Sequence, residues 1–256
     1  MWFGCFKGEI DWRRMDHEYF IEGVHLPVPR DAQEFVTALG KEFPAENEPI
    51  TEFFEQMKHV YREMYSDIDK TGGVPTYPRT VEDLLAYSAS HPHAMRWMDR
   101  PFSEMLDTYF KDVRLKKLLT VLTGYLSDDP TVLTTGELAP IFGYYFDGGY
   151  YPAGGSQVPA NALVRVIERH EGHLHLRTPV EHIIVDDGRA TGVRLASGDV
   201  HHAKAIISDA DLRRTFLDLV GSDRLPLHFG RQLEALQPST SAFIVFLGLD
   251  FVPEIA

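Results

Sequence analysis

The stretch from residue 148 to residue 220 constrains the fold of this chain more than any other part of it. It opens with a glycine-containing turn and continues with apolar residues at helical spacing as far as Gly172, which ends the pattern. Apolar runs follow, separated by Asp187-Gly188 and Ser197-Gly198. Tight hairpin loops need a positive φ, which glycine accepts without steric cost. The stretch therefore predicts a buried amphipathic helix followed by a three-stranded antiparallel meander.

Four runs in this stretch have the character of strands. They are residues 173–176, 180–185, 190–195 and 200–207. In the first run histidine alternates with leucine, which is typical of a half-buried strand. The last run ends in Ala205-Ile206-Ile207, as expected for a strand buried on both faces. Short polar residues from Ser208 to Asp211 then predict the cap of a helix that runs to Val220.

The rest of the chain has a mostly helical pattern. Asp31 predicts the cap of a helix that ends near Phe43. Further helices are predicted at residues 50–68, 81–87, 101–110, 113–122, 136–146 and 229–236, and short strands at 18–21, 24–27 and 241–249. Residues 71–78 have the composition of a loop. The aromatic and methionine stripe of residues 50–68 fits either a core or the wall of an apolar tunnel, and packing in a core is favoured.

Four short motifs carry a resemblance to a known family. They are Tyr151-Pro-Ala-Gly-Gly155, Thr178-Pro-Val180, Gly192-Val193 and Ile207-Ser-Asp-Ala-Asp211. In this order and spacing the stretch resembles the flavin-dependent phytoene desaturase group, which includes carotenoid cis-trans isomerases and retinol saturases. This group lies within the flavin amine oxidase superfamily. The flanking regions match it only loosely.

The resemblance implies a mixed α/β fold, as part of a two-domain FAD/NAD(P)-binding oxidoreductase. Residues 1–146 would form a helix-rich substrate-binding domain with short strands. Residues 147–221 would form the central part of the FAD-binding domain, and residues 222–256 would return to the substrate domain. The implied reaction is hydride transfer between flavin and a carotenoid, another polyene or a similar apolar substrate. The choice among desaturation, isomerisation and saturation stays open.

The resemblance also assigns five residues to the cofactor. It implies that the backbone of Val180 contacts the adenine end of FAD, and that Gly154 and Gly155 bring a helix start close to the flavin or the substrate. Asp209 and Ala210 would lie beside the cofactor. A structural role remains open for each: Val180 as a strand residue, the glycines as a turn, and Asp209 as a helix cap.

Aromatic residues crowd the junction before and after residue 148. They are Tyr144, Tyr145, Phe146, Tyr150 and Tyr151. Apolar ligand pockets favour domain junctions, so these five are the candidate substrate-binding residues. A packed seam between domains explains the same pattern equally well.

One expected motif of the family is absent. The sequence contains no G-x-G-x-x-G, the loop that holds the pyrophosphate of a dinucleotide at a helix N-terminus. The family's C-terminal Gly-Asp segment, which contacts flavin, is missing as well. We therefore expect an internal portion of a longer enzyme, which alone binds flavin weakly or not at all and is poorly soluble. The alternative is a cofactor-less fragment or a non-catalytic scaffold that retains the substrate-domain fold.

Composition limits the partners of the chain. The formal charge of −13 disfavours nucleic acid and anionic lipid, because both require a basic surface. His170, His173 and His175 lack a carboxylate or cysteine that would complete a metal-ligand set, so no metal is expected. The single cysteine fits a reducing compartment, and no apolar run approaches a membrane span. The expected location is cytoplasmic, with peripheral membrane contact at most.

Overall fold

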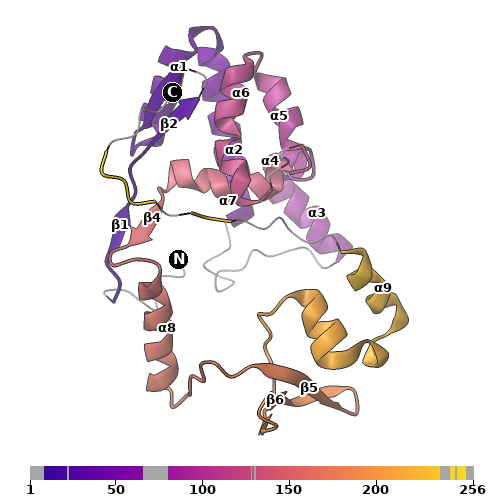
Figure 1. Cartoon of the computed structure of the whole chain (residues 1–256). Helices are drawn as coiled ribbons and strands as arrows, with labels where there is room; N and C mark the ends of the chain where they lie inside the picture. Colours follow the sequence, from indigo (N-terminus) through magenta and orange to yellow (C-terminus); the bar gives the residue numbers. More distant parts are fainter. Residues whose placement is uncertain are drawn as a thin grey trace. The chain divides into compact units, whose positions relative to one another are not determined.

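A computed structural model describes residues 9–21, 23–65, 80–127, 129, 131–236, 243–245 and 247–251. The chain divides into two compact units, which are described separately below. Unit 1 comprises Met1–Leu163 and Thr240–Ala256, and unit 2 comprises Val164–Ser239. Helices and antiparallel sheets occur together (Figure 1), which confirms the predicted mixed α/β class.

Unit 1 is mainly helical. Its helices are α1 (Ala32–Glu42), α2 (Asn47–Tyr65), α3 (Val81–Ser90), α4 (Pro92–Trp97), α5 (Phe102–Tyr109), α6 (Val113–Leu119) and α7 (Thr135–Phe146), with the short 3₁₀ helices η2 (Pro44–Glu46) and η3 (Val121–Tyr125). Asp31 caps α1 as predicted, because its carboxylate accepts the backbone N–H groups of Gln33 and Glu34. Thr80 and Thr134 form capping boxes with Asp83 and Glu137. Local sequence thus determines where these helices begin.

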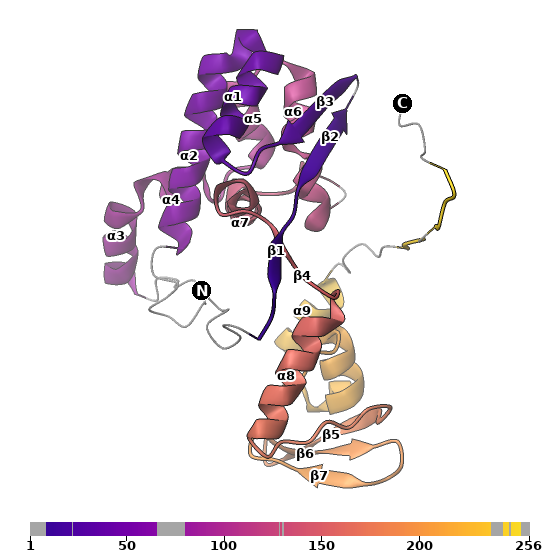
Figure 2. The same cartoon turned by 90° about the vertical axis from the view of Figure 1, so that its left-hand side faces the viewer.

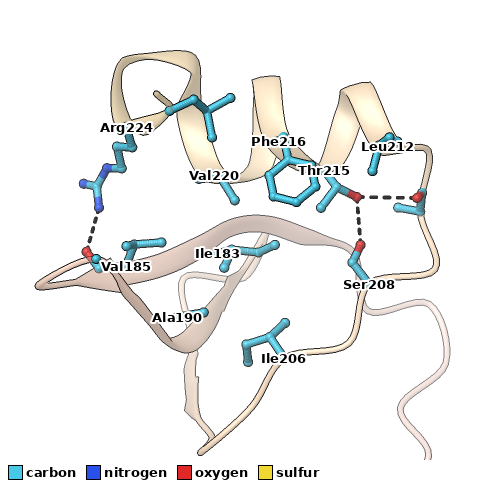
Figure 3. Close-up of a pocket in the computed structure, with 13 residues that line it drawn as sticks. Ile183, Val185, Ala190, Ile206, Ser208, Leu212, Thr215, Phe216, Val220 and Arg224 are labelled. Atoms are coloured by element: carbon cyan, nitrogen blue, oxygen red, sulfur yellow. Dashed lines mark hydrogen bonds between the residues drawn. The ribbon is translucent and has the colours of Figure 1, made fainter. Parts of the chain in front are cut away.

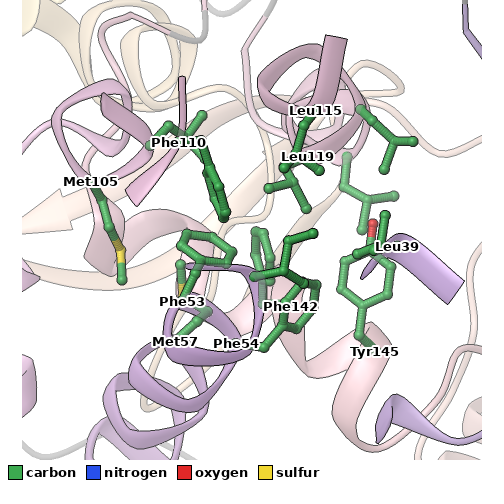
Figure 4. Close-up of a cluster of buried hydrophobic side chains, with 14 of the residues drawn as sticks. Leu39, Phe53, Phe54, Met57, Met105, Phe110, Leu115, Leu119, Phe142 and Tyr145 are labelled. Carbon is green, nitrogen blue, oxygen red and sulfur yellow. The ribbon is translucent and has the colours of Figure 1, made fainter. Parts of the chain in front are cut away.

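The core of unit 1 forms around α2, which packs against α1, α4, α5 and α7. Phe53 of α2 and Phe142 of α7 are fully buried, with ring centroids 5.7 Å apart (Figure 4). Leu39, Met105 and Phe110 join the same cluster from three other segments. The aromatic stripe predicted for residues 50–68 therefore packs in a core, at least over the residues of α2.

Two pairs of strands complete unit 1. The predicted hairpin is present as β2 (His17–Ile21) and β3 (Val24–Val28), and it lies beside α1 and α6 (Figure 2). A second pair joins β1 (Trp12–Arg14) to β4 (Tyr150–Pro152). The sequence predicted only a turn at Tyr150 and Tyr151. This prediction missed the strand because its hydrogen-bonding partner lies far away in the chain.

Helix α8 (Gln157–Arg169) begins in unit 1 and ends in unit 2. Its first turn contains Pro159, where the missing N–H has no helical partner to lose. The helix ends at Arg169, before the predicted Gly172, because Glu171 takes the left-handed conformation at φ 59°. Ala162 is its only buried residue. The helix is amphipathic as predicted, but the prediction that it is buried is wrong, because Leu163 and Ile167 of its apolar face are exposed.

Unit 2 contains the predicted meander. Strands β5 (Val180–Asp186), β6 (Arg189–Leu195) and β7 (Val200–His202) pair antiparallel in that order. Asp187 and Gly188 between β5 and β6 both have positive φ, at 49° and 74°, as a type I′ hairpin turn requires. A π-helix η4 (Arg214–Gly221), a short η5 (Ser222–Arg224) and α9 (Leu227–Ala235) follow. The turn dipeptides therefore predicted the meander correctly.

The strand predictions are wrong in three places. Residues 173–176 form no strand, and the predicted strand 200–207 ends at His202, with Ile207 96% exposed. The described residues of the predicted strand 241–249 are also outside any strand and exposed. A strand needs a neighbour to satisfy its backbone groups, and beyond the bond from the Ala203 N–H to the Thr191 carbonyl no described strand pairs with these runs. The predicted loop at residues 71–78 lies outside the described residues.

None of the described helices combines the length and the apolar composition needed to cross a bilayer.

Candidate functional site

Unit 2 contains a hollow of about 420 Å³ between the hairpin of β5 and β6 and the helix η4 (Figure 3). Its walls are mainly apolar, and Ile183, Ala190 and Phe216 are among the residues that line it. Phe216 of η4 lies over the strands of the hairpin (Figure 3). The volume falls within the range of small-molecule pockets.

A polar cluster holds one end of this hollow together. Thr215 is buried, and its hydroxyl donates to the carbonyl of Ala210 at 3.4 Å. The hydroxyls of Ser208 and Thr215 are hydrogen-bonded at 2.8 Å (Figure 3). Either hydroxyl can be the donor in this shorter bond. These bonds attach the segment 208–210 to η4.

The opposite end of the hollow is closed by an arginine. The Nη1 of Arg224 donates to the carbonyl of Val185 at 2.8 Å. Asp211 accepts the backbone N–H of Arg214 at 2.8 Å and so caps the helix, which leaves the proposed cap role of Asp209 without support. Asp209 itself is exposed. The sequence thus located the cap to within two residues.

The candidate cofactor residues fall in both units. Gly154 and Gly155 lie in the turn between β4 and α8 in unit 1, with φ of 92° and 98°. Val180 is the first, half-buried residue of β5, opposite Leu195, and Ala210 lines the hollow of unit 2. Within unit 2, Val180, Asp209 and Ala210 belong to one strand and the loop that follows the meander. Their assignment to a cofactor stays a prediction.

Unit 1 contains a second hollow, of about 370 Å³, between β2 and η3. Aromatic residues supply much of its wall: Tyr19 from β2, Tyr125 from η3 and Tyr144 from α7. Val121 and Leu122 add aliphatic surface, and Tyr125 is 80% exposed at the rim. The hollow is therefore an open cavity with aromatic walls.

A histidine and a tyrosine are paired at this second hollow. Nδ1 of His17 and the hydroxyl of Tyr144 are 3.0 Å apart, and the two rings meet edge to face. Burial raises the pKa of the Tyr144 hydroxyl, and burial lowers the pKa of His17 below its ordinary value of 6.5, with Asp16 opposing this shift. At neutral pH the pair therefore consists of a neutral imidazole and a protonated phenol.

The other candidate substrate residues have different surroundings. Tyr145 is buried in the core, where it stacks on Phe35 and its hydroxyl is hydrogen-bonded to that of Tyr19 at 2.8 Å. Burial raises the pKa of Tyr19 to about 12. Phe146 is half-buried against the same core, and Tyr150 and Tyr151 are exposed on β4. Of these five candidates only Tyr144 lines the hollow between β2 and η3.

Sequence reasoning did not identify His17 or Tyr125. His17 lies on the side of β2 that carries Tyr19 and Ile21, and this alternation is the one signal that could have placed it inward. Tyr125 belongs to no recognisable motif. Its position at the hollow depends on the packing of η3 against the hairpin, which no local pattern reports.

A model of the flavin containing amine oxidoreductase family matches residues 17–214 of this chain. The chain belongs to this family. The match begins in β2 and ends in η4, so it runs through both units. It confirms the resemblance that the motifs of residues 148–220 indicated.

Curated members of the family resemble this chain over most of its length. A phytoene desaturase (neurosporene-forming) of Cereibacter sphaeroides is 26% identical over 86% of this chain and 42% of its own length. An all-trans-retinol 13,14-reductase of Danio rerio is 25% identical, with coverages of 97% and 43%. An all-trans-zeta-carotene desaturase of Myxococcus xanthus is 27% identical, with coverages of 91% and 44%. The chain therefore spans less than half the length of these relatives.

The protein in a crystal structure from Pyrococcus furiosus is 22% identical to this chain. The match covers 54% of this chain and 36% of the Pyrococcus furiosus chain. The TM-score is 0.44, which is too low for a comparison of architectures.

The described residues fit part of a flavin site of this family. A Cβ at Gly155 would meet no atom within 4 Å, so the turn before α8 leaves room for a flat group to approach the backbone. The hollow of unit 2 offers apolar walls, but its cation Arg224 already donates to Val185, and no glycine-rich phosphate loop is present in the sequence. The chain thus offers contact surfaces for flavin but no described group for the pyrophosphate.

The histidines of unit 2 lie near one another without forming a metal site. The rings of His173 and His175 are 6.4 Å apart, and those of His175 and His201 are 5.7 Å apart. Within the part of the chain that the structure describes, no group of three or more histidine, cysteine, aspartate or glutamate side chains could hold a metal ion.

The pKa of His17 predicts a pH dependence of stability. Because the folded state holds a neutral His17 with a pKa below 6.5, the unfolded chain binds the proton more readily. The stability that the neutral His17 contributes is therefore present in full above pH 6.5, and it is lost as the pH falls through the lower pKa of His17 in the folded state. Urea unfolding at a series of pH values should show a steeper loss below pH 6.5 for the wild type than for His17→Gln. Equal slopes would contradict a buried neutral His17.

Proposed function

We propose that this chain is part of an FAD-dependent oxidoreductase that acts on a carotenoid or a similar polyene by hydride transfer to or from flavin. The observation that supports this most is the family match over residues 17–214, since it includes both the aromatic hollow of unit 1 and the meander of unit 2. The relatives are named as a phytoene desaturase, a zeta-carotene desaturase and a retinol reductase. In this proposal residues 1–146 bind substrate, residues 147–221 belong to the FAD-binding domain, and residues 222–256 return to the substrate domain.

The chain's own residues bind and orient in this proposal. Flavin, when bound, supplies the hydride chemistry. The open turn at Gly154 and Gly155 allows close approach of its ring, and Val180, Asp209 and Ala210 provide backbone contacts in unit 2. The aromatic walls at Tyr19, Tyr125 and Tyr144 give an apolar chain a surface to pack against.

Two matched glycine variants test the flavin contact. Gly155 and Gly198 have φ of 98° and 91°, and a Cβ at either would meet no atom within 4 Å. Alanine therefore imposes a similar backbone strain at both positions, but only Gly155 belongs to the proposed cofactor surface. FAD added to the ¹⁵N-labelled chain should shift the amide signals of the five candidate cofactor residues. Gly155→Ala should weaken this binding about tenfold more than Gly198→Ala, a difference of about 1.4 kcal/mol.

The outcome separates the proposal from its alternative. Amide shifts confined to the candidate residues, with sensitivity to Gly155→Ala, support a flavin-binding portion of an enzyme. A folded chain whose spectrum does not change with millimolar FAD would contradict the cofactor contacts proposed for this chain and favour the cofactor-less fragment or the non-catalytic scaffold.

A further inference from the structure

The hydrogen bond between His17 and Tyr144 can be formed in two ways, and burial distinguishes them. Nε2 of His17 is buried and has no hydrogen-bond partner among the residues that the structure describes, although Nδ1 lies 3.0 Å from the Tyr144 hydroxyl. If Nε2 carried the proton, a buried N–H donor would be left without an acceptor. A bare acceptor nitrogen is the less costly choice, because orphaned donors are rarer than orphaned acceptors in folded proteins. The neutral ring therefore carries its proton on Nδ1.

This tautomer determines what Tyr144 can do. With the proton on Nδ1, His17 donates to the phenol oxygen of Tyr144 across their separation of 3.0 Å, so the phenol's own proton is not used in that bond. Burial keeps the phenol protonated, because it raises the pKa of the Tyr144 hydroxyl. Tyr144 lines the hollow of about 370 Å³, so its O–H is available as a donor there. Tyr19, which also lines this hollow, differs because its hydroxyl is bonded to that of Tyr145.

We infer that the hollow between β2 and η3 binds the oxygen-bearing end of a conjugated apolar ligand, an alcohol or a carbonyl, through a hydrogen bond from Tyr144 that His17 orients. The inference rests on the proposed function for the polyene character of the ligand and adds the polar end group and the residue that recognises it. The rings of Tyr125 and Tyr19 and the side chains of Val121 and Leu122 surround the hydrocarbon part. A hydrocarbon without oxygen offers the phenol proton no acceptor and displaces the water that could accept it, so the hollow discriminates in favour of the oxygenated ligand.

Ligand binding tests the inference without flavin or turnover. All-trans-retinol is the probe, and the matching hydrocarbon with a methyl group in place of the CH₂OH is the reference. Both are followed by ligand fluorescence on titration of the full chain. Tyr144→Phe should weaken retinol binding about tenfold, the loss of one hydrogen bond, and leave hydrocarbon binding unchanged. Tyr109→Phe is the matched control, because Tyr109 is a half-buried tyrosine of α5 that does not line the hollow.

A second measurement examines His17 directly. Long-range ¹H–¹⁵N correlation of the labelled chain should show the Nδ1–H tautomer at neutral pH, a signature that a general packing role would not require. Detection of the Nε2–H tautomer would overturn the inference, because Tyr144 would then donate to His17.

The binding results have equally definite consequences. Retinol binding that is lost in Tyr144→Phe and kept in Tyr109→Phe supports the inference. Equal affinity of wild type and Tyr144→Phe for retinol, or no retinol binding by the folded wild type, overturns it. The proposed function is tested separately, by the amide shifts that FAD causes.

Discussion

Replacing Phe53 with alanine should lower the free energy of unfolding of unit 1 by about 3–5 kcal/mol. The side chain is fully buried, and five aromatic rings surround it at centroid distances of 5.1–6.3 Å. These rings come from α2, α5, α7 and the residue after α5, so a collapse of one helix into the cavity would disturb the others. The cost therefore includes the cavity as well as the lost burial. Denaturant unfolding followed by near-UV circular dichroism of the aromatic core measures it.

Phe20 provides the control for this prediction. It is a phenylalanine of β2 that is 46% exposed and stacks on His25 at 4.3 Å. Phe20→Ala loses one aromatic contact and leaves no cavity, so the expected loss is about 1 kcal/mol or less. Similar losses for Phe53→Ala and Phe20→Ala would show that α2 does not form the centre of the core.

Replacing Glu46 with alanine should destabilise unit 1 by about 2–3 kcal/mol. Glu46 ends η2 and is only 7% exposed, and its Oε1 accepts the backbone N–H groups of Lys111 and Asp112, both at 2.7 Å. It thus joins the turn between α1 and α2 to the segment that enters α6. Alanine would leave both N–H groups without their acceptor. Urea unfolding should show the loss, and hydrogen exchange at Lys111 and Asp112 should become faster.

Glu46→Gln separates the charge of this side chain from its role as an acceptor. Glutamine retains an oxygen in the same place, but hydrogen bonds to a charged acceptor are roughly twice as strong as neutral ones. About half of the loss seen in Glu46→Ala is expected. Unchanged hydrogen exchange at Lys111 and Asp112 in Glu46→Ala would contradict the bridging role.

The predicted elements that were confirmed depend on residues close together in the chain. Asp31 caps α1 through the N–H groups of the next few residues, and Asp187-Gly188 makes its turn through its own φ angles. The family motifs of residues 148–220 are local in the same sense, and the family match confirmed what they indicated. Such features depend on sequence alone because the interacting groups are neighbours before the chain folds.

Local sequence patterns predicted only part of the candidate site. Tyr144 was found because aromatic residues are crowded at the end of α7, but the same crowding includes Tyr145, which packs in the core. Adjacent residues of a helix point in different directions, so composition could not separate the two. His17 carries no motif, and its partner Tyr144 is brought to it by the packing of β2 near α7.

The sequence by itself determined most of the helices, the cap of α1, the order of strands in the meander and the family. The tertiary structure decided which of the apolar runs became strands, the pairing of β1 with β4, the bond from Glu46 to the start of α6, and the pairing of His17 with Tyr144. Residues 204–207 have the composition of a buried strand, but no described strand pairs with them. The physical reason is the same in each case: a backbone or buried polar group is satisfied by whichever partner folding brings near, and that partner lies far away in the sequence.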